Sequence, residues 1–304
     1  MGVRLAMAVD VGGTKLRAAL VTSDGRVLHR DVRATPATSG AQAVVSAIAE
    51  ACRAVRLATD APRDLPLGLC APGPLNARTG IALGTPTIAG FTDFPLRQAV
   101  EDALQTEVII ENDGPAGALG EWRYGGGRGT DSFAYITVST GIGGGLVADG
   151  RLVRGRLGLA GHVGHLPVKP GGAVCFCGQQ GHWEAEASGT ALGIKARAAG
   201  FRSLPDVFEL ARAGNGAAME FTRRAADDIA VGLVAITHLT SPEVLVIGGG
   251  VSNAFDLLGP LLRERLDRSL LPSFRQVRLK KAECGDDCGL LGVGLLALDP
   301  TLRA

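Results

Sequence analysis

Four side chains that commonly bind transition metals stand close together in the middle of the chain. Two thiols, Cys175 and Cys177, are one residue apart, and imidazoles precede and follow them at His165 and His182. Zn²⁺ takes thiolate and imidazole ligands in a tetrahedron, and a glycine-rich loop with few apolar residues has little else to fix its shape. The pattern predicts a closed structural zinc site, which leaves no position for a reacting water. The alternative is an exposed thiol pair beside unrelated histidines.

Two glycine-rich turns that contain threonine form a second set of candidates. The first is Gly12-Gly13-Thr14, and the second includes Thr140 and Gly141 at the start of the run 139–145. A turn of this kind exposes backbone N–H groups and a hydroxyl, which suits the oxygens of a phosphate. A single occurrence is more typical of an ordinary hairpin turn.

The elements around these turns occur twice in the chain. Apolar runs predict strands at Arg4–Asp10, Leu16–Val21 and Val27–Val32, with an Asp-Gly hairpin turn before the third. The same order of strand, glycine turn, strand, Asp-Gly-Arg turn and strand returns between Phe133 and Val153. This repetition favours two similar units from a duplicated ancestor. Because each unit contains a glycine turn, the repetition predicts that the protein binds a polyphosphate.

A carboxylate follows a predicted buried strand between the two repeats. The strand is expected at Glu107–Ile110, and Glu111, Asn112 and Asp113 come directly after it. Ligands of open α/β sheets bind beyond the carboxyl ends of strands, which makes Asp113 a candidate. From position alone, an N-cap of the alanine-rich helix Pro115–Trp122 explains it better.

The rest of the chain alternates helical and strand patterns, which predicts an α/β protein. A third glycine turn, Gly248-Gly249-Gly250, stands between a predicted strand at Glu243–Ile247 and a helix at Ala254–Ser269. There a flat ring or a phosphate can approach the backbone at a helix N-terminus. Other helices are expected at Gly40–Leu57, Pro95–Leu104, Ser188–Ala199, Leu204–Ala213, Ala217–Thr240 and Leu290–Leu298, and other strands at Leu65–Cys70 and Gln276–Lys280.

Composition narrows the class of protein. The chain has 304 residues, of which 46% are hydrophobic, so it can bury a large core and two domains are expected. A formal charge of +1 gives no electrostatic reason to expect nucleic acid or an anionic membrane as a partner. Six cysteines in a chain of this length do not form a secreted disulfide framework. With no leader pattern and no long apolar run, we expect a soluble, cytoplasmic protein.

Several separated motifs together resemble the ROK family of sugar kinases and repressors, over nearly the whole chain. In chain order they are Asp10–Lys15, Glu111–Asp113, Ser139–Gly145, Gly164-His165, Cys175–Gly178, Glu184 and Gly248–Val251. The resemblance implies an actin/hexokinase-like fold, a duplicated ribonuclease H-like architecture with two α/β domains around a cleft. The first domain is expected at 1–113 plus a returning helix at 289–304, and the second at 114–288 with the zinc-bound loop.

The resemblance also implies an activity and a role for each matching residue. Asp113 matches a general base that accepts the proton of a sugar hydroxyl as the oxygen attacks the γ-phosphate of ATP. His165 matches a residue with two duties, one ring nitrogen on zinc and the other toward the sugar. The remaining substrate-binding positions are Gly73, Thr87, Asn112, His162 and Glu184, and the nucleotide positions are Asp10 near Mg²⁺, Gly12, Gly13, Thr14, Lys15, Thr140, Gly141, Gly248, Gly249 and Gly250.

Two departures from the family pattern bear on the metal and the substrate. His182 stands where the family usually has a third cysteine, which predicts a Cys₂His₂ set. His162 stands where glucose-type members usually carry glutamate. A carboxylate accepts hydrogen bonds from two hydroxyls, whereas a neutral imidazole accepts one and donates one, which suits a substituent with its own acceptor such as an N-acetyl group.

The substrate expectation follows from that substitution. Residues 158–165 are also similar to bacterial N-acetylmannosamine kinases, so N-acetylmannosamine is favoured and glucose is the runner-up. The loop Thr85–Ile88 is an argument against N-acetylmannosamine, since it lacks the asparagine common in the family. The reaction is expected at the 6-OH of a hexose or N-acetylhexosamine.

A sugar-sensing repressor and a non-catalytic sugar-binding module are the alternatives of another class. ROK repressors carry an N-terminal winged helix, and the first predicted strand begins within five residues of Met1, which we expect to leave no room for one. A binding module would not need Asp113 together with both phosphate turns. We therefore expect an enzyme whose partners are a sugar and ATP, with no nucleic acid or membrane, assembled as a homodimer or homotetramer.

Overall fold

The structure is a computed structural model that describes residues 2–303 and divides into two compact units. Unit 1 contains the chain up to Arg128, the segment Arg151–Gly161 and the C-terminal part from Asp286. Unit 2 contains Gly129–Gly150 and His162–Gly285. The expected division was 1–113 plus 289–304 against 114–288. The observed unit 1 is larger, because the helix that begins at Asp113 and the segment from Arg151 both group with it.

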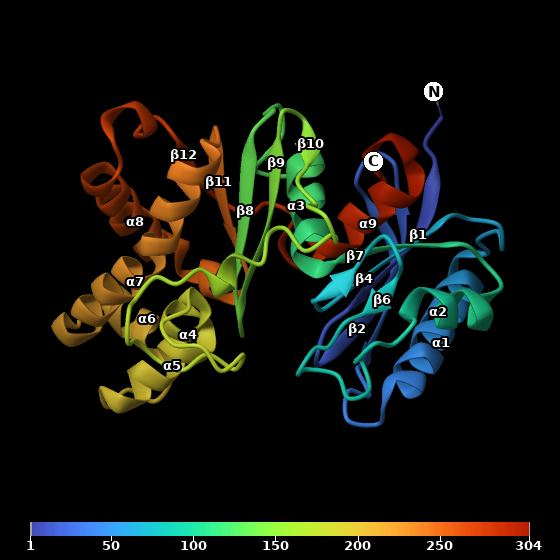
Figure 1. Ribbon diagram of the computed structural model, residues 1–304, viewed down its shortest axis with the longest axis horizontal. Helices are drawn as coiled ribbons and strands as arrows, with labels where there is room; N and C mark the ends of the chain where they lie inside the picture. The colour runs from blue at the N-terminus through green and yellow to red at the C-terminus, as the bar shows by residue number, and fades with distance from the viewer. Residues whose placement is uncertain (1, 304) are drawn as a thin grey trace. The chain divides into compact units, whose positions relative to one another are not determined.

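Unit 1 is built on a five-stranded sheet in the order β3-β2-β1-β4-β7 (Figure 1). Strand β1 pairs antiparallel with β2 and parallel with β4, and β4 pairs parallel with β7. β1 and β4 are almost continuously buried, as expected for strands covered on both faces. The strands are β1 (Leu5–Val11), β2 (Lys15–Thr22), β3 (Val27–Ala34), β4 (Leu67–Ala71) and β7 (Val108–Asn112), with a small pair β5 (Leu75–Asn76) and β6 (Ile81–Ala82).

The helices of unit 1 include an apolar C-terminal helix that is buried on all sides, as such helices must be. Glycines let this helix approach its neighbours closely. A Cβ on Gly292 would lie 1.8 Å from the Ala116 carbonyl oxygen, and one on Gly120 would lie 2.2 Å from the Cys288 carbonyl oxygen. The helices are α1 (Ala41–Thr59), α2 (Leu96–Leu104), α3 (Asp113–Tyr124) and α9 (Cys288–Leu298), followed by the 3₁₀ helix η5 (Pro300–Arg303) and preceded by η4 (Gly285–Asp287).

The second sheet has the order β10-β9-β8-β11-β12, in which β8, β9, β11 and β12 belong to unit 2 and β10 belongs to the segment that groups with unit 1. β8 pairs antiparallel with β9 and parallel with β11, and β11 pairs parallel with β12. The strands are β8 (Phe133–Val138), β9 (Ile142–Ala148), β10 (Arg151–Leu152), β11 (Val244–Gly248) and β12 (Arg278–Lys281). The helices are α4 (Trp183–Ala187), α5 (Gly189–Ala198), α6 (Leu204–Arg212), α7 (Gly216–Thr240) and α8 (Phe255–Ser269), with 3₁₀ helices η1 (Val163–His165), η2 (Gly250–Ala254) and η3 (Pro272–Phe274).

The two sheets share one topology, in agreement with the predicted duplication. In each, the first two strands pair antiparallel and the third lies beside the second, while two parallel strands extend the sheet from its first strand.

One feature of the second glycine turn was predicted wrongly. Gly143, Gly144 and Gly145 belong to β9 and pair with β8, so the turn is confined to Ser139–Gly141. A Cβ on Gly144 would lie 2.5 Å from the Tyr135 carbonyl oxygen, which explains a glycine inside the strand.

Between residues 2 and 303, no helix combines the length and the apolar character that crossing a membrane requires.

Candidate active site and metal centre

Asp113, the predicted catalytic residue, and Asp10, a predicted nucleotide residue, both lie at the carboxyl ends of parallel strands in unit 1. Asp10 of β1 is in register with Cys70 of β4, and Cys70 is in register with Glu111 of β7. Asp113 follows β7 as the first residue of α3. Ligands of open α/β sheets bind at this edge.

Asp113 is exposed and does not cap α3, so the capping interpretation is wrong. The N-cap is Asn112, whose side chain makes no capping hydrogen bond, and Asp113 Oδ1 accepts a hydrogen bond of 2.7 Å from the Gly114 N–H. Shielding from bulk water by the surrounding protein, and then the charge of Asp10, raise the pKa of Asp113 to about 6. A carboxylate with a pKa near neutrality is suited to general base catalysis.

Asp10 lies between a cation and a thiol. Arg17 Nη2 is 3.5 Å from its Oδ2, and the Cys70 thiol donates to its Oδ1 at 3.4 Å. Burial raises the pKa of Asp10, and the Arg17 charge opposes that shift. A half-buried carboxylate two residues before the first glycine turn fits a role near Mg²⁺, which prefers oxygen ligands.

The first glycine turn is a tight connection between β1 and β2. The Gly12 N–H donates to the Lys15 carbonyl oxygen at 2.8 Å, while Thr14 and Lys15 are exposed. A Cβ on Gly13 would lie 3.2 Å from Cβ of Thr87, so the structure brings the turn next to this predicted substrate residue. Thr87 is itself exposed.

The side-chain amide of Asn112, a predicted substrate residue, is hydrogen-bonded to backbone groups. Its Oδ1 accepts from the Leu75 N–H at 2.9 Å, and its Nδ2 donates to the carbonyl oxygens of Leu75 at 2.8 Å and Gly158 at 3.0 Å. Both amide hydrogens are therefore used, and the side chain is buried. This arrangement differs from the predicted hydroxyl-binding role: the Asn112 amide ties the end of β7 to the turn that contains Gly73, which is half-buried.

Arg154, which no sequence motif indicated, neutralises the buried Glu111. Arg154 Nε donates to Glu111 Oε2 at 3.1 Å, and its Nη2 donates to the Leu302 carbonyl oxygen at 2.7 Å. Glu111 Oε1 accepts from the Asn112 N–H at 2.9 Å. The signal was available, because a glutamate at the end of a buried strand needs a cation, but the sequence does not say which one.

In unit 2 the second glycine turn lies against the third glycine turn and the start of α5. The Gly189 N–H donates to the Ser139 carbonyl oxygen at 2.7 Å, and Thr140 is exposed. Gly249 has φ +79°, and a Cβ on it would lie 2.5 Å from the Val138 carbonyl oxygen. The predicted nucleotide residues Thr140, Gly141, Gly248, Gly249 and Gly250 therefore come together.

Glu184, a predicted substrate residue, reaches the same turn. Its Oε2 accepts from the Ile142 N–H at 2.9 Å, and a Cβ on Gly141 would lie 2.3 Å from that oxygen. The Oε2 atom of Glu184 thus fixes the second glycine turn. Glu184 stands on α4, a short helix that sequence analysis did not predict.

The predicted metal ligands come together in unit 2. The four candidate ligand atoms of His165, Cys175, Cys177 and His182 all lie within 4.8 Å of one another. His182 Nδ1 is 3.3 Å from both His165 Nδ1 and Cys177 Sγ, and Cys175 Sγ is 3.8 Å from His165 Nδ1. Tetrahedral zinc with bonds of about 2.0–2.3 Å separates its ligand atoms by roughly 3.3–3.8 Å, which these three separations match, so the four side chains could hold this ion.

Comparison with known proteins identifies the family. The model of the ROK family matches residues 6–300. The chain belongs to the ROK family. This ROK protein is 34% identical to a glucokinase of Thermotoga maritima, over 94% of this chain and 95% of that protein. It is 35% identical to an N-acetylmannosamine kinase of Yersinia pseudotuberculosis, over 96% of this chain and 97% of that protein.

A solved structure of a sugar kinase is also similar to this chain over nearly its whole length. A ROK family glucokinase from Streptomyces griseus, crystallised with glucose and AMPPNP, matches with a TM-score of 0.85 and 32% identity, over 97% of this chain and 99% of that one. The ROK protein described here has the actin/hexokinase-like two-domain fold that its motifs predicted. It is an ATP-dependent sugar kinase.

Proposed function

We propose that this ROK kinase transfers the γ-phosphoryl group of ATP to the 6-OH of a hexose or N-acetylhexosamine, with Asp113 as the general base. The observation that carries the proposal is the Asp113 carboxylate, which is reachable by solvent at a strand end and has a pKa of about 6. Phosphoryl transfer requires an oriented hydroxyl and neutralised phosphate charge more than covalent chemistry. Asp113 accepts the hydroxyl proton as the oxygen attacks phosphorus.

Each unit supplies its own phosphate ligands in this proposal. In unit 1, Gly12 closes the turn through its hydrogen bond to the Lys15 carbonyl oxygen. Gly13 and Thr14 offer backbone N–H groups and a hydroxyl, and Lys15 adds a positive charge. In unit 2, Thr140 and Gly141 bind the phosphates, and the backbone of Gly248–Gly250 borders the adenosine. Mg²⁺ near Asp10 neutralises charge on the phosphate oxygens.

The Cys₂His₂ cluster holds a structural Zn²⁺ in this proposal. Support comes from the spacing of the ligand atoms and from the orientation of the imidazoles, whose Nδ1 atoms face the cluster. His165 Nε2 is then free to reach the sugar. The metal supplies shape to the loop and takes no part in the transfer.

N-acetylmannosamine is the substrate we favour, with glucose as the runner-up. The favouring observation is the imidazole of His162, half-buried three residues before His165, which can donate to an N-acetyl carbonyl oxygen. Gly73, Thr87 and Glu184 stay in the proposed sugar site, whereas Asn112 supports it through the backbone. We further propose a cytoplasmic location, where ATP is available, and a homodimer or homotetramer.

The test is an ATP-consumption assay over a panel of hexoses and N-acetylhexosamines. We expect sugar-dependent turnover, with the highest kcat/KM for N-acetylmannosamine and a lower value for glucose. A His162→Glu variant should shift the ratio toward glucose. A panel without sugar-dependent turnover would reject the proposed reaction, and a preference for glucose in the wild type would reject only the substrate.

A further inference from the structure

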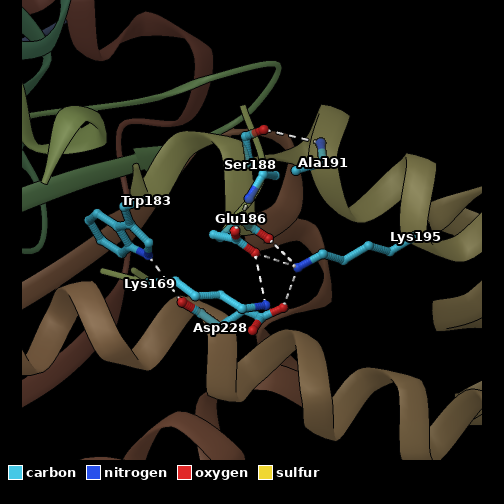
Figure 2. Close-up of polar contacts among 8 residues, drawn as sticks. Lys169, Trp183, Glu186, Ser188, Ala191, Lys195 and Asp228 are labelled. Atoms are coloured by element: carbon cyan, nitrogen blue, oxygen red, sulfur yellow. Dashed lines mark hydrogen bonds and ion pairs between the residues drawn. The ribbon is translucent and has the colours of Figure 1, made fainter. Parts of the chain in front are cut away.

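A buried carboxylate that the sequence analysis did not single out holds the metal loop, residues 167–182, against the rest of unit 2 (Figure 2). Glu186 stands on α4, and its side chain is only 4% exposed. Its Oε1 accepts a hydrogen bond of 2.6 Å from the Ala173 N–H. Ala173 precedes Cys175 by two residues, so this bond fixes the backbone next to a proposed ligand.

Two lysines balance the charge of this carboxylate. Lys195 of α5 places its Nζ 3.4 Å from Glu186 Oε2 and donates to the Asp228 Oδ2 of α7 at 2.7 Å. Lys169, in the metal loop itself, places its Nζ 3.5 Å from the same Glu186 oxygen. The loop, α4 and α5 therefore meet at one carboxylate, and α7 joins them through the contact between Lys195 and Asp228, as Figure 2 shows.

The backbone of the loop is folded closely around this contact. A Cβ on Gly172 would lie 2.2 Å from Glu186 Oε1, so glycine is needed there. The Gly181 N–H donates to the Ala173 carbonyl oxygen at 2.9 Å, and the Cys175 N–H donates to that of Gln179 at 2.7 Å. The hydrogen bond to Glu186 thus stands at the base of the hairpin that carries the cysteines.

The helix that carries Glu186 is itself anchored. Trp183 is fully buried, and its Nε1 donates to the Asp228 carbonyl oxygen at 3.1 Å. A Cβ on Gly232 of α7 would lie 2.2 Å from the Trp183 ring, which shows how closely the two helices pack. Because α4 is fixed in this way, its carboxylate can act as a rigid attachment point for the loop.

We propose that Glu186 is a positioning residue of the metal centre, which holds the loop so that His165, Cys175, Cys177 and His182 face one another. The inference rests on the proposed zinc site and deepens it. Groups outside the ligand shell orient metal ligands, and their loss typically lowers metal affinity by about 10–100-fold. Glu186 acts one step further out, through the loop backbone and the Lys169 charge.

The test compares Glu186→Gln and Glu186→Ala with wild type in the full chain. Glutamine keeps an acceptor for the Ala173 N–H and loses the charge, whereas alanine loses both. We expect zinc affinity, measured by competition with a chromophoric chelator, to fall at least about tenfold in the alanine variant and less in the glutamine variant. Alkylation of Cys177 in chelator-treated protein should become faster in the same order.

The matched control is Glu220→Gln on α7, which removes a carboxylate from an exposed ion pair in the same unit. It should leave zinc affinity and alkylation at wild-type values. Wild-type values in both Glu186 variants would overturn the proposal. If neither Glu186 variant folds, Lys169→Gln decides, because this side chain is 61% exposed: a zinc affinity lowered more than twofold supports the proposal, and an unchanged one overturns it.

Failure of the zinc site itself is a separate result. If the wild type binds no zinc, the proposed metal centre falls, and hydrogen exchange then tests the positioning role without metal. Faster exchange of the amides of Ala173, Cys175 and Gly181 in Glu186→Ala would support the role of Glu186. Unchanged exchange at these amides would reject it.

Discussion

At the scale of single residues, Asp113 combines access to solvent with a pKa raised to about 6. Shielding by the surrounding protein is the first cause and the charge of Asp10 is the second. Such a group is deprotonated at neutral pH and still basic enough to accept a proton. This balance is what a general base in phosphoryl transfer requires.

Asp113→Asn removes the base and leaves a side chain of the same shape. We expect turnover to fall by at least about a hundredfold, the lower end of the range for acid–base groups, with little change in the KM for the sugar. Steady-state kinetics measures this, with circular dichroism as the check on folding. Turnover close to wild type would remove Asp113 from the mechanism.

The pH dependence of the reaction should report the same group. The pKa of Asp113 is raised to about 6, so the carboxyl is protonated and inactive as a base below that pH. We expect kcat/KM for the sugar to fall about tenfold per pH unit below pH 6 and to level off above it. The folded state favours the protonated form, so the stabilising contribution of this group is complete below the ordinary pKa of 3.8 and is lost as pH rises through about 6.

A thermal melt separates these two effects. Asp113→Asn should melt at the same temperature as wild type at pH 4 and at a higher temperature at pH 8, because the variant carries no charge to shield from water. A kcat/KM without an inflection between pH 5 and 7 would contradict the assigned base.

At the scale of elements, segments outside the main helices and strands are held by buried polar contacts. Arg154 ties the segment Arg151–Gly161 to Glu111 at the end of β7 and to the backbone of Leu302 in η5. Glu186 ties the metal loop to α4. In both places a charge buried in the protein has a partner, as its desolvation requires.

Arg154→Met should leave Glu111 charged and without its partner in the protein interior. We expect the free energy of unfolding to fall by about 3–5 kcal/mol, measured by denaturant titration. The control is Arg26→Met, which removes an exposed ion pair with Asp24 in the same unit and should cost less than about 1 kcal/mol. The double variant Arg154→Met with Glu111→Gln should recover part of the loss. Equal small effects in Arg154→Met and Arg26→Met would contradict this account.

The metal loop gives a second prediction at this scale. Purified protein should contain about one zinc per chain, and His182→Ala should lose it because three ligands remain. His182→Cys restores the ligand set usual in the family and should bind zinc at least as tightly as wild type. Elemental analysis and a chelator titration measure both. A wild type without zinc, with Cys175 and Cys177 freely alkylated, would refute the site.

At the scale of the whole molecule, two units of equal topology each carry part of the predicted nucleotide-binding set. Asp10 and the first glycine turn lie in unit 1, and the second and third glycine turns lie in unit 2. The proposed reaction therefore draws on both halves of the duplicated fold.

AMPPNP with Mg²⁺, and separately the preferred sugar, should each raise the melting temperature. At a ligand concentration about 100 times the dissociation constant, linkage predicts roughly 2.7 kcal/mol of added stability. Differential scanning fluorimetry measures the shift, with a sugar inactive in the panel as the control. If neither ligand changes the melting temperature at saturating concentration, the protein does not bind the proposed substrates.

The sequence by itself determined the features that depend on local order along the chain. The spatial grouping of His165, Cys175, Cys177 and His182 could be predicted because these residues lie close together along the chain. The duplication could be predicted because the same succession of strands and turns occurs twice. Both sheets have the strand arrangement that this repetition indicates.

Only the tertiary structure decided which distant groups meet. The Asn112 amide is bound to the backbone of Leu75 and Gly158, and Glu111 finds its cation 43 positions along the chain at Arg154. Asp113 begins its helix instead of capping it. The physical reason is that hydrogen bonds and ion pairs of buried groups depend on strand register and chain return, whereas propensity and spacing record only near neighbours.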